Sequence, residues 1–254
     1  MVQGDVDNGW AVLTDDGRGG GLRALRRPDG RRHLFFLGAA TDEYGPLVET
    51  ALRALDTDLY VEVDEADAAA LTALTERGFV VHRSEHRYAV PTDPAVTGLG
   101  VGLGDVELRS VMAADPDRWR VLDDELRGEV PGAGGWRNDP VSFASDTFAD
   151  PEFDPALYLI AVDRVTDAYL GLTRVWNRQP RPRLGLIGTA ADHRRRGVAR
   201  HLLAEAFGVL HRRGHHEVTC EVDERNTASN ALLLGVGARR EGGGVELLRR
   251  GAAG

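Results

Sequence analysis

The stretch Thr189-Ala-Ala-Asp-His-Arg-Arg-Arg-Gly-Val-Ala-Arg-His-Leu-Leu203 decides the fold of this chain. An apolar segment of strand length, residues 184–188, precedes it. After it, apolar residues recur every fourth position from Val198 to Leu210, which predicts an amphipathic helix ending at Gly214. A strand therefore leads through a basic turn into a helix. Such a turn directs free backbone N–H groups and the positive end of a helix dipole at one point, which suits a phosphate or pyrophosphate group.

The turn does not carry the common nucleotide-binding motifs. The chain contains no lysine, which excludes a P-loop, and the glycine spacing of a dinucleotide fingerprint is missing here. The turn instead reads Arg194-x-x-Gly197-x-Ala199. This pattern resembles the Arg/Gln-x-x-Gly-x-Gly/Ala signature of the GNAT (GCN5-related N-acetyltransferase) family, whose loop holds the pyrophosphate of acetyl-CoA. The alternative for these six residues alone is a solvated arginine cluster at the start of a surface helix.

Length and composition restrict the class of protein. A chain of 254 residues, 42% of them hydrophobic, can build one large domain or two of ordinary size. The formal charge of −9 argues against nucleic-acid binding and is compatible with a cationic small-molecule partner. The single cysteine, Cys220, fits a reducing compartment, and the first residues lack the pattern of a signal peptide. We therefore expect a cytoplasmic protein that binds neither nucleic acid nor membrane, as a monomer or homodimer.

Two segments of the chain resemble each other. Residues 62–78 align without gaps on residues 221–237; both begin with Glu-Val-Asp-Glu and both end with glycine. The match predicts an internal duplication, and chance similarity between two alanine-rich helices is the alternative. The same register places residues 35–40 opposite residues 194–199, with Gly38 opposite Gly197.

The first copy lacks the chemistry of the second. No arginine stands in residues 35–40, and Asp42 and Glu43 follow at the start of the next helix, where they would repel a pyrophosphate. We therefore predict three segments: residues 1–92 as a degenerate GNAT-like half, residues 93–104 as a linker, and residues 105–254 as the catalytic GNAT domain.

The element order after the linker is characteristic. The patterns predict β-α-α-β-β-β-α-β-α-β, with the last strand at residues 245–249. This is the order of the GNAT fold, so the resemblance extends over the whole second half. The expected fold class is α/β (α+β): two GNAT-like mixed sheets flanked by helices, in tandem.

The resemblance implies a site for acetyl-CoA as the acetyl donor, without a metal. In the family, the pantetheine arm inserts between the fourth and fifth strands of the domain, and Asn226 matches an asparagine beside it. The backbone candidates next to the thioester are Ile187, Gly188 and Thr189. The candidates for the pyrophosphate are Arg194, Arg195, Arg196, Gly197, Val198, Ala199 and Arg200.

The catalytic groups are less marked. Many relatives place a tyrosine seven residues after the asparagine, where it protonates the leaving thiolate, but this chain has Leu233. Ser229 is the predicted substitute, with support of the helix N-terminus as the alternative role. Glu221 is the predicted base, with Asp223 on the same face of the strand as the other candidate, because a carboxylate can take a proton from an ammonium group through water. Plain surface charge is the alternative for Glu221, since its counterpart Glu62 lies in the degenerate half.

The expected activity is acetyl-CoA-dependent N-acetylation of an amine, with a small molecule as the acceptor. The family resemblance implies that the acceptor side is formed by regions that contain Trp136, Trp176, Glu129 and the acidic run 123–125. The acidic run is equally compatible with a solvated helix face. One alternative is acetylation of a protein or peptide amine. Another is a non-catalytic CoA-binding sensor or interaction module, which the missing tyrosine favours.

Overall fold

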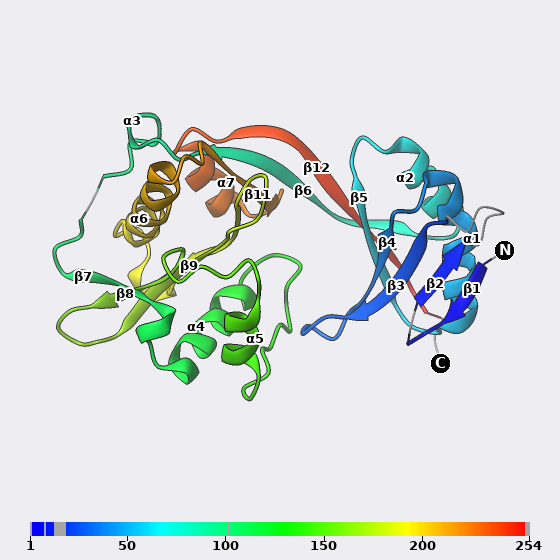
Figure 1. Ribbon diagram of the computed structural model, residues 1–254, viewed down its shortest axis with the longest axis horizontal. Coiled ribbons are helices and arrows are strands. Elements are labelled where there is room, and N and C mark those ends of the chain that lie inside the picture. Colours follow the sequence, from blue (N-terminus) through cyan, green and yellow to red (C-terminus); the bar gives the residue numbers. More distant parts are fainter. Residues whose placement is uncertain (1, 8, 13–18, 101, 252–254) are drawn as a thin grey trace. The chain divides into compact units, whose positions relative to one another are not determined.

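The computed structural model of the protein describes residues 2–7, 9–12, 19–100 and 102–251. The chain divides into two compact units, the first made of residues 1–85 with 242–254 and the second of residues 86–241. Two long strands, β6 (Val80–Pro91) and β12 (Arg239–Arg249), contribute to both units (Figure 1). Each unit is a sheet with helices packed on it.

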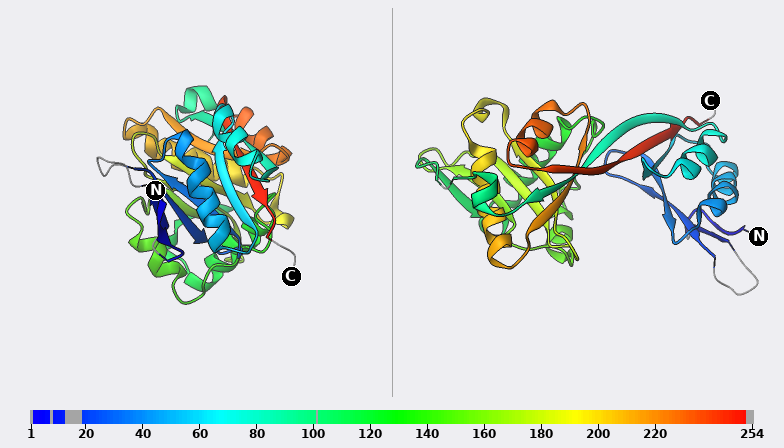
Figure 2. Two further views of the ribbon diagram at one scale, coloured as in Figure 1. Left: turned by 90° about the vertical axis from the view of Figure 1, so that its right-hand side faces the viewer. Right: turned by 90° about the horizontal axis from the view of Figure 1, so that it is seen from above.

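The first unit has the strand order β1-β2-β3-β4-β5-β12. The pairs are antiparallel except that β4 and β5 run parallel. Helices α1 (Thr41–Ala54) and α2 (Ala68–Thr75), which Figure 2 shows beside this sheet, share one apolar core with it. The first five strands are β1 (Val2–Asp5), β2 (Gly9–Val12), β3 (Gly21–Arg26), β4 (Arg32–Leu37) and β5 (Leu59–Asp64).

The last strand of the chain completes the first unit. β12 pairs antiparallel with β5, so that Leu247 lies opposite Val61, and Leu247 is buried in the core of this unit. The sequence predicts residues 245–249 as the last strand of the second half, but the structure pairs them with β5 of the first unit. The reason is that alternation in a sequence indicates a strand but not the edge with which the strand pairs.

The second unit has the strand order β6-β11-β10-β9-β8-β7. Helices α4 and α5 share a core with one face of this sheet, and α6 and α7 with the other. The strands are β7 (Val106–Ser110), β8 (Tyr158–Asp163), β9 (Tyr169–Trp176), β10 (Arg183–Thr189) and β11 (Glu217–Asp223). The helices are α3 (Pro94–Thr97), α4 (Pro116–Gly128), α5 (Phe143–Ala149), α6 (Val198–Arg212) and α7 (Thr227–Leu234), with 3-10 turns η1 (Val111–Ala113) and η2 (Ala191–His193).

The segment 93–104, which we expected to be a linker, packs onto the second unit. It includes α3, and Leu99 is buried in the core that α6 and α7 cover. Leu103 packs against the same core. The prolines and glycines of this segment limit long elements, as predicted from the sequence, but its leucines still bury apolar surface.

The two segments that resemble each other in sequence have the same backbone. β5 leads into α2 as β11 leads into α7, and the N-cap residues Asp67 and Asn226 have φ/ψ of −82/73° and −79/73°. Each of these side chains accepts a hydrogen bond from the backbone N–H three residues further on. The glycines that follow the helices, Gly78 and Gly237, have φ of +81° and +85°. The repeat predicted from the alignment is therefore present in the structure.

Strands β10 and β11 diverge almost at once. Within the described residues their ladder holds one pair, Arg183 with Thr219. β10 stays paired with β9 over its length, but the register shifts at Gly185. A Cβ at Gly185 would come within 1.5 Å of the Trp176 ring, so this bulge requires glycine. Beyond this pair, the described residues show no ladder between β10 and β11.

Candidate functional site

A cavity of about 730 Å³ lies between the end of β10, the turn after it, the C-terminal end of α4, and helices α6 and α7. Its lining contains Ser229 and ten of the eleven predicted cofactor residues: Ile187, Gly188, Thr189, Arg194, Arg195, Gly197, Val198, Ala199, Arg200 and Asn226. Arg196 and Glu221 do not line it. The turn, the strand end and α7 thus meet around one space, although they are separated in the sequence.

The turn between β10 and α6 presents backbone groups to this cavity. Arg195 and Gly197 both have left-handed backbone, with φ of +62° and +86°. Gly197 is the N-cap of α6, and no side chain in the described part of the chain caps this helix. The first-turn N–H groups of a 15-residue helix are therefore available to an anion, and the helix dipole adds to their attraction.

The arginines of the turn differ in their partners. The Arg194 Nε donates to the backbone oxygen of Thr189 at 3.1 Å, and its guanidinium is ion-paired with Glu129. Arg200 donates to the backbone oxygen of Gly98 at 2.9 Å. Both arginines line the cavity, so their charge can reach a ligand there.

Helix α7 closes the other side of the cavity. The Asn226 side chain accepts from the Ser229 backbone N–H at 3.1 Å, which leaves the Ser229 hydroxyl outside this cap. Leu233, where relatives carry the tyrosine, is 1% exposed and lies in the core. Two residues that support the β11–α7 turn, Tyr88 and Asn230, were not predicted from the sequence. Tyr88 donates its hydroxyl hydrogen to the Asn230 side chain at 2.8 Å, and the Asn230 amide donates to the backbone of this turn.

The predicted carboxylates lie elsewhere. Glu221 accepts a hydrogen bond from the Arg183 Nε at 2.6 Å, and Arg183 belongs to the single pair described between β10 and β11. Asp223, on the same strand, is 2% exposed and bonded to Arg225. Glu129 is the carboxylate that lines the cavity among the described residues. It follows α4 and was predicted on the acceptor side, but its pairing with Arg194, 65 residues later, has no local pattern in the sequence.

The acidic run on α4 is mostly structural. Asp123 is fully buried and accepts from the Tyr158 hydroxyl at 3.0 Å and from the Arg127 Nε at 2.6 Å. Asn138 donates to both Asp123 and Asp124, at 2.8 and 2.9 Å. Burial and the neighbouring Asp123 charge raise the pKa of Tyr158 well above its usual value. The solvated helix face is therefore wrong for Asp123 and Asp124, because these carboxylates hold the loop that contains Asn138.

The described residues contain neither a metal-binding cluster nor a membrane-spanning helix. Among them, no group of three histidine, cysteine, aspartate or glutamate side chains is placed to hold a metal ion. Nor does that part of the chain contain a helix with the length and apolarity needed to cross a membrane.

Comparison with known proteins agrees with this geometry. Residues 121–237 match the model of the acetyltransferase (GNAT) family. No curated protein matches the sequence. Among solved structures, a GCN5-related N-acetyltransferase from Sphaerobacter thermophilus is similar at a TM-score of 0.72 and 20% identity, over 95% of this chain and 80% of that one. A tandem GNAT protein from the clavulanic acid biosynthesis pathway, solved without AcCoA, is similar at 0.72 and 19% identity, over 97% and 83%.

These similarities have different weight. At 19–20% identity the solved structures show a shared fold, and they cover both units of the chain. The family match is a match of sequence, and it extends from within α4 to just beyond α7, the elements that surround the cavity. The predicted fold class is confirmed. Residues 121–237 therefore resemble the acetyltransferase (GNAT) family in sequence, and the chain shares its fold with a tandem GNAT protein.

Proposed function

We propose that the second unit transfers the acetyl group of acetyl-CoA to the amine of a small molecule. The family of residues 121–237 supports acyl transfer in general. The observation that carries acetyl-CoA as the donor is the cavity of about 730 Å³ at the uncapped N-terminus of α6, with Arg194, Arg195 and Arg200 in its lining. Open amides, a helix dipole and arginines are the groups that bind a pyrophosphate.

The rest of the donor fits along β10. The edge of β10 around Gly188 has no partner in β11, so the amides of the pantetheine arm can pair with it as an added strand would. Gly188 also brings the backbone close to α4, because a Cβ there would come within 3.0 Å of Leu126. A backbone N–H at residues 187–189 is then placed to polarise the thioester carbonyl.

The reaction needs few protein groups. The neutral amine attacks the thioester carbon, the C–N bond forms, and the C–S bond breaks as the CoA thiolate leaves. The nitrogen loses a proton to water, and the thiolate gains one. Glu221 is bonded to Arg183 outside the cavity lining, so it would take the first proton only through bridging water. Ser229 lines the cavity and is our proposed donor of the second.

Ser229→Ala separates the two roles of this residue. The alanine keeps the backbone N–H that Asn226 caps, so helix α7 and the melting temperature should be unchanged. If the hydroxyl protonates the thiolate, kcat for CoA release should fall about tenfold, with KM for acetyl-CoA within about twofold. Steady-state thiol release measures both constants, and an unchanged kcat would assign Ser229 to the helix alone.

The function itself is tested by binding and turnover. Acetyl-CoA should raise the melting temperature by mass action, and absence of a shift at millimolar ligand contradicts the proposal. Thiol release with a panel of small amines should then identify the acceptor. Because Leu233 is buried in place of a tyrosine, a CoA-binding module without turnover is the second candidate. Binding without thiol release from any small amine or peptide amine would favour that candidate.

We further propose that the first unit binds no acetyl-CoA. Residues 38–40 join β4 to α1, a turn shorter than residues 190–197 of the second unit. The α1 N-terminus is filled by Glu43, whose carboxylate accepts from the backbone N–H groups of Ala40 at 2.8 Å and Gly20 at 3.3 Å. The N-cap of α1 is Ala40, which therefore corresponds to Gly197 by its place in the helix; the ungapped alignment had paired Gly38 with Gly197.

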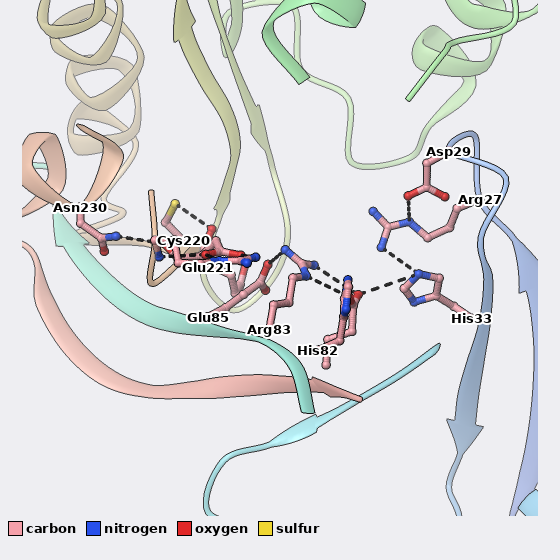
Figure 3. A network of polar contacts seen from close by, with 12 residues as sticks. Arg27, Asp29, His33, His82, Arg83, Glu85, Cys220, Glu221 and Asn230 are labelled. Atoms are coloured by element: carbon pink, nitrogen blue, oxygen red, sulfur yellow. Dashed lines mark hydrogen bonds and ion pairs between the residues drawn. The ribbon is translucent and has the colours of Figure 1, made fainter. Parts of the chain in front are cut away.

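The charge beside this helix is also unfavourable for a pyrophosphate. A cavity of about 350 Å³ in the first unit is lined by Glu62, Asp64 and Asp67 and by the stacked rings of Phe36 and Tyr44, 3.7 Å apart. Arg27, which also lines it, lies beside His33 and Asp29 (Figure 3). In the first unit, carboxylates therefore stand at the three positions that align with Glu221, Asp223 and Asn226. Residues 35–40, which align with the basic turn, contain no arginine.

A further inference from the structure

The ion pair between Glu129 and Arg194 joins the two sides of the donor cavity. Glu129 is the residue that follows α4, and Arg194 belongs to the turn before α6. Both side chains line the cavity, and both are about half exposed, at 44% and 46%. The pair is therefore accessible to a ligand that enters the cavity, and it is made by an arginine in the pyrophosphate position of the turn.

The position of Glu129 is electrostatically unfavourable for a carboxylate in two respects. It stands at the C-terminal end of a 13-residue helix, where the negative end of the dipole disfavours a second negative charge. It also faces a cavity whose other charged side chains are arginines. Arg194 offsets both effects, and the Arg194 Nε bond to the Thr189 oxygen keeps the guanidinium at this place. Glu129 is thus a carboxylate from the end of α4 that pairs with an arginine of the anion-binding turn.

We propose that Glu129 competes with the pyrophosphate of CoA for the Arg194 guanidinium and so weakens the binding of both acetyl-CoA and the product CoA. This inference rests on the proposed donor site. A guanidinium that bonds a phosphate bidentately has to give up its carboxylate partner, and the displaced carboxylate then repels the bound phosphates. Competition of this kind acts on substrate and product alike, because both carry the same pyrophosphate. Its benefit to an enzyme is faster release of CoA after acetyl transfer.

The effect should be modest in size. Exposed ion pairs are weak, and loss of the pair by Glu129→Gln should tighten the binding of CoA by about two- to fivefold. Removal of the repulsion between Glu129 and the phosphates acts in the same direction. Arg194→Gln should weaken CoA binding about tenfold, since a charge-assisted bond is lost.

A double-mutant cycle tests the competition directly. The dissociation constant of CoA is measured by calorimetry for the unchanged protein, for Glu129→Gln, for Arg194→Gln and for both together. Glu125→Gln is the matched control, because Glu125 is an exposed glutamate one turn earlier on α4 and does not line the cavity. We expect the largest tightening from Glu129→Gln alone, a clearly smaller tightening when the same substitution is made beside Arg194→Gln, and a change below about 1.5-fold for Glu125→Gln.

The outcomes separate this inference from the proposed function. If the unchanged protein does not bind CoA, the donor site itself is wrong. If CoA binds but Glu129→Gln binds it equally or more weakly, Glu129 does not compete and the inference is overturned. Equal tightening in the presence and absence of Arg194, or equal tightening by Glu125→Gln, overturns it as well, because the charge would then act without the ion pair.

Discussion

Gly197→Glu is expected to weaken acetyl-CoA binding by at least about a hundredfold. Gly197 is the N-cap of α6 and lines the cavity, so the new carboxylate would lie among the first-turn N–H groups that we assign to the pyrophosphate. It would accept those hydrogen bonds itself and repel the phosphates, and each charge-assisted bond lost costs about 1.5–3 kcal/mol. The position has room for a side chain, since the nearest atom to a Cβ is 3.7 Å away, on Leu103.

Backbone strain has to be separated from charge in this experiment. Gly197 has φ of +86°, and any other residue there is strained. Gly214, at the other end of the same helix, has φ of +84° and open space around it, so Gly214→Glu carries the same charge and the same strain without touching the cavity. Calorimetric titration with acetyl-CoA should show lost binding for Gly197→Glu and unchanged binding for Gly214→Glu. Equal losses for the two would refute the assignment of the turn.

Gly38→Glu gives the matching experiment in the first unit. Gly38 also has a left-handed φ, of +64°, and lies in the turn before α1. Because Glu43 already fills the N-terminus of α1, we expect acetyl-CoA binding to stay within about twofold of that of the unchanged protein. A loss as large as that of Gly197→Glu would mean that the first unit takes part in donor binding.

The sequence could predict that its contiguous segments meet around one cavity, whereas the binding of acetyl-CoA by these residues stays a prediction. The strand end, the turn and the start of α6 follow one another, and ten of the eleven residues chosen for the donor line one cavity. Asn226 was predicted from its position just after the fifth strand of the domain, where the family resemblance implies an asparagine, and the structure makes it the N-cap of α7. Local patterns are strong where one short segment carries both the element and the ligand groups.

Contacts between distant segments could not be predicted. Glu129 meets Arg194 only because α4 packs across β10, and the sequence gives no measure of that approach. The burial of Asp123 was also hidden, since an acidic run on a helix has the same pattern whether its partners are water or Tyr158 and Arg127. The alternating apolar pattern of β12 indicated a strand, but its pairing with β5 depends on which sheet edge is free, and the sequence does not show this.

Leu247→Ala is expected to destabilise the first unit by about 2–5 kcal/mol, although Leu247 stands seven residues from the last one of the chain. The side chain is 1% exposed, and it packs with the core residues of the first unit from its place opposite Val61. Its removal leaves a cavity in that core and weakens the hold of β12 on β5. Hydrogen exchange should therefore speed up in residues 59–64, while residues 169–176 of β9 in the second unit stay protected.

The control for this substitution is Leu37→Ala, which removes the same atoms from a side chain of the first unit that is 53% exposed. It should change the stability by less than about 1 kcal/mol, because little apolar surface is buried there. Acetyl-CoA binding should survive both substitutions, since neither leucine lines the donor cavity. Faster exchange in β9 rather than in β5 after Leu247→Ala would contradict the placement of β12, and would return the last strand to the second half, as its position in the sequence had suggested.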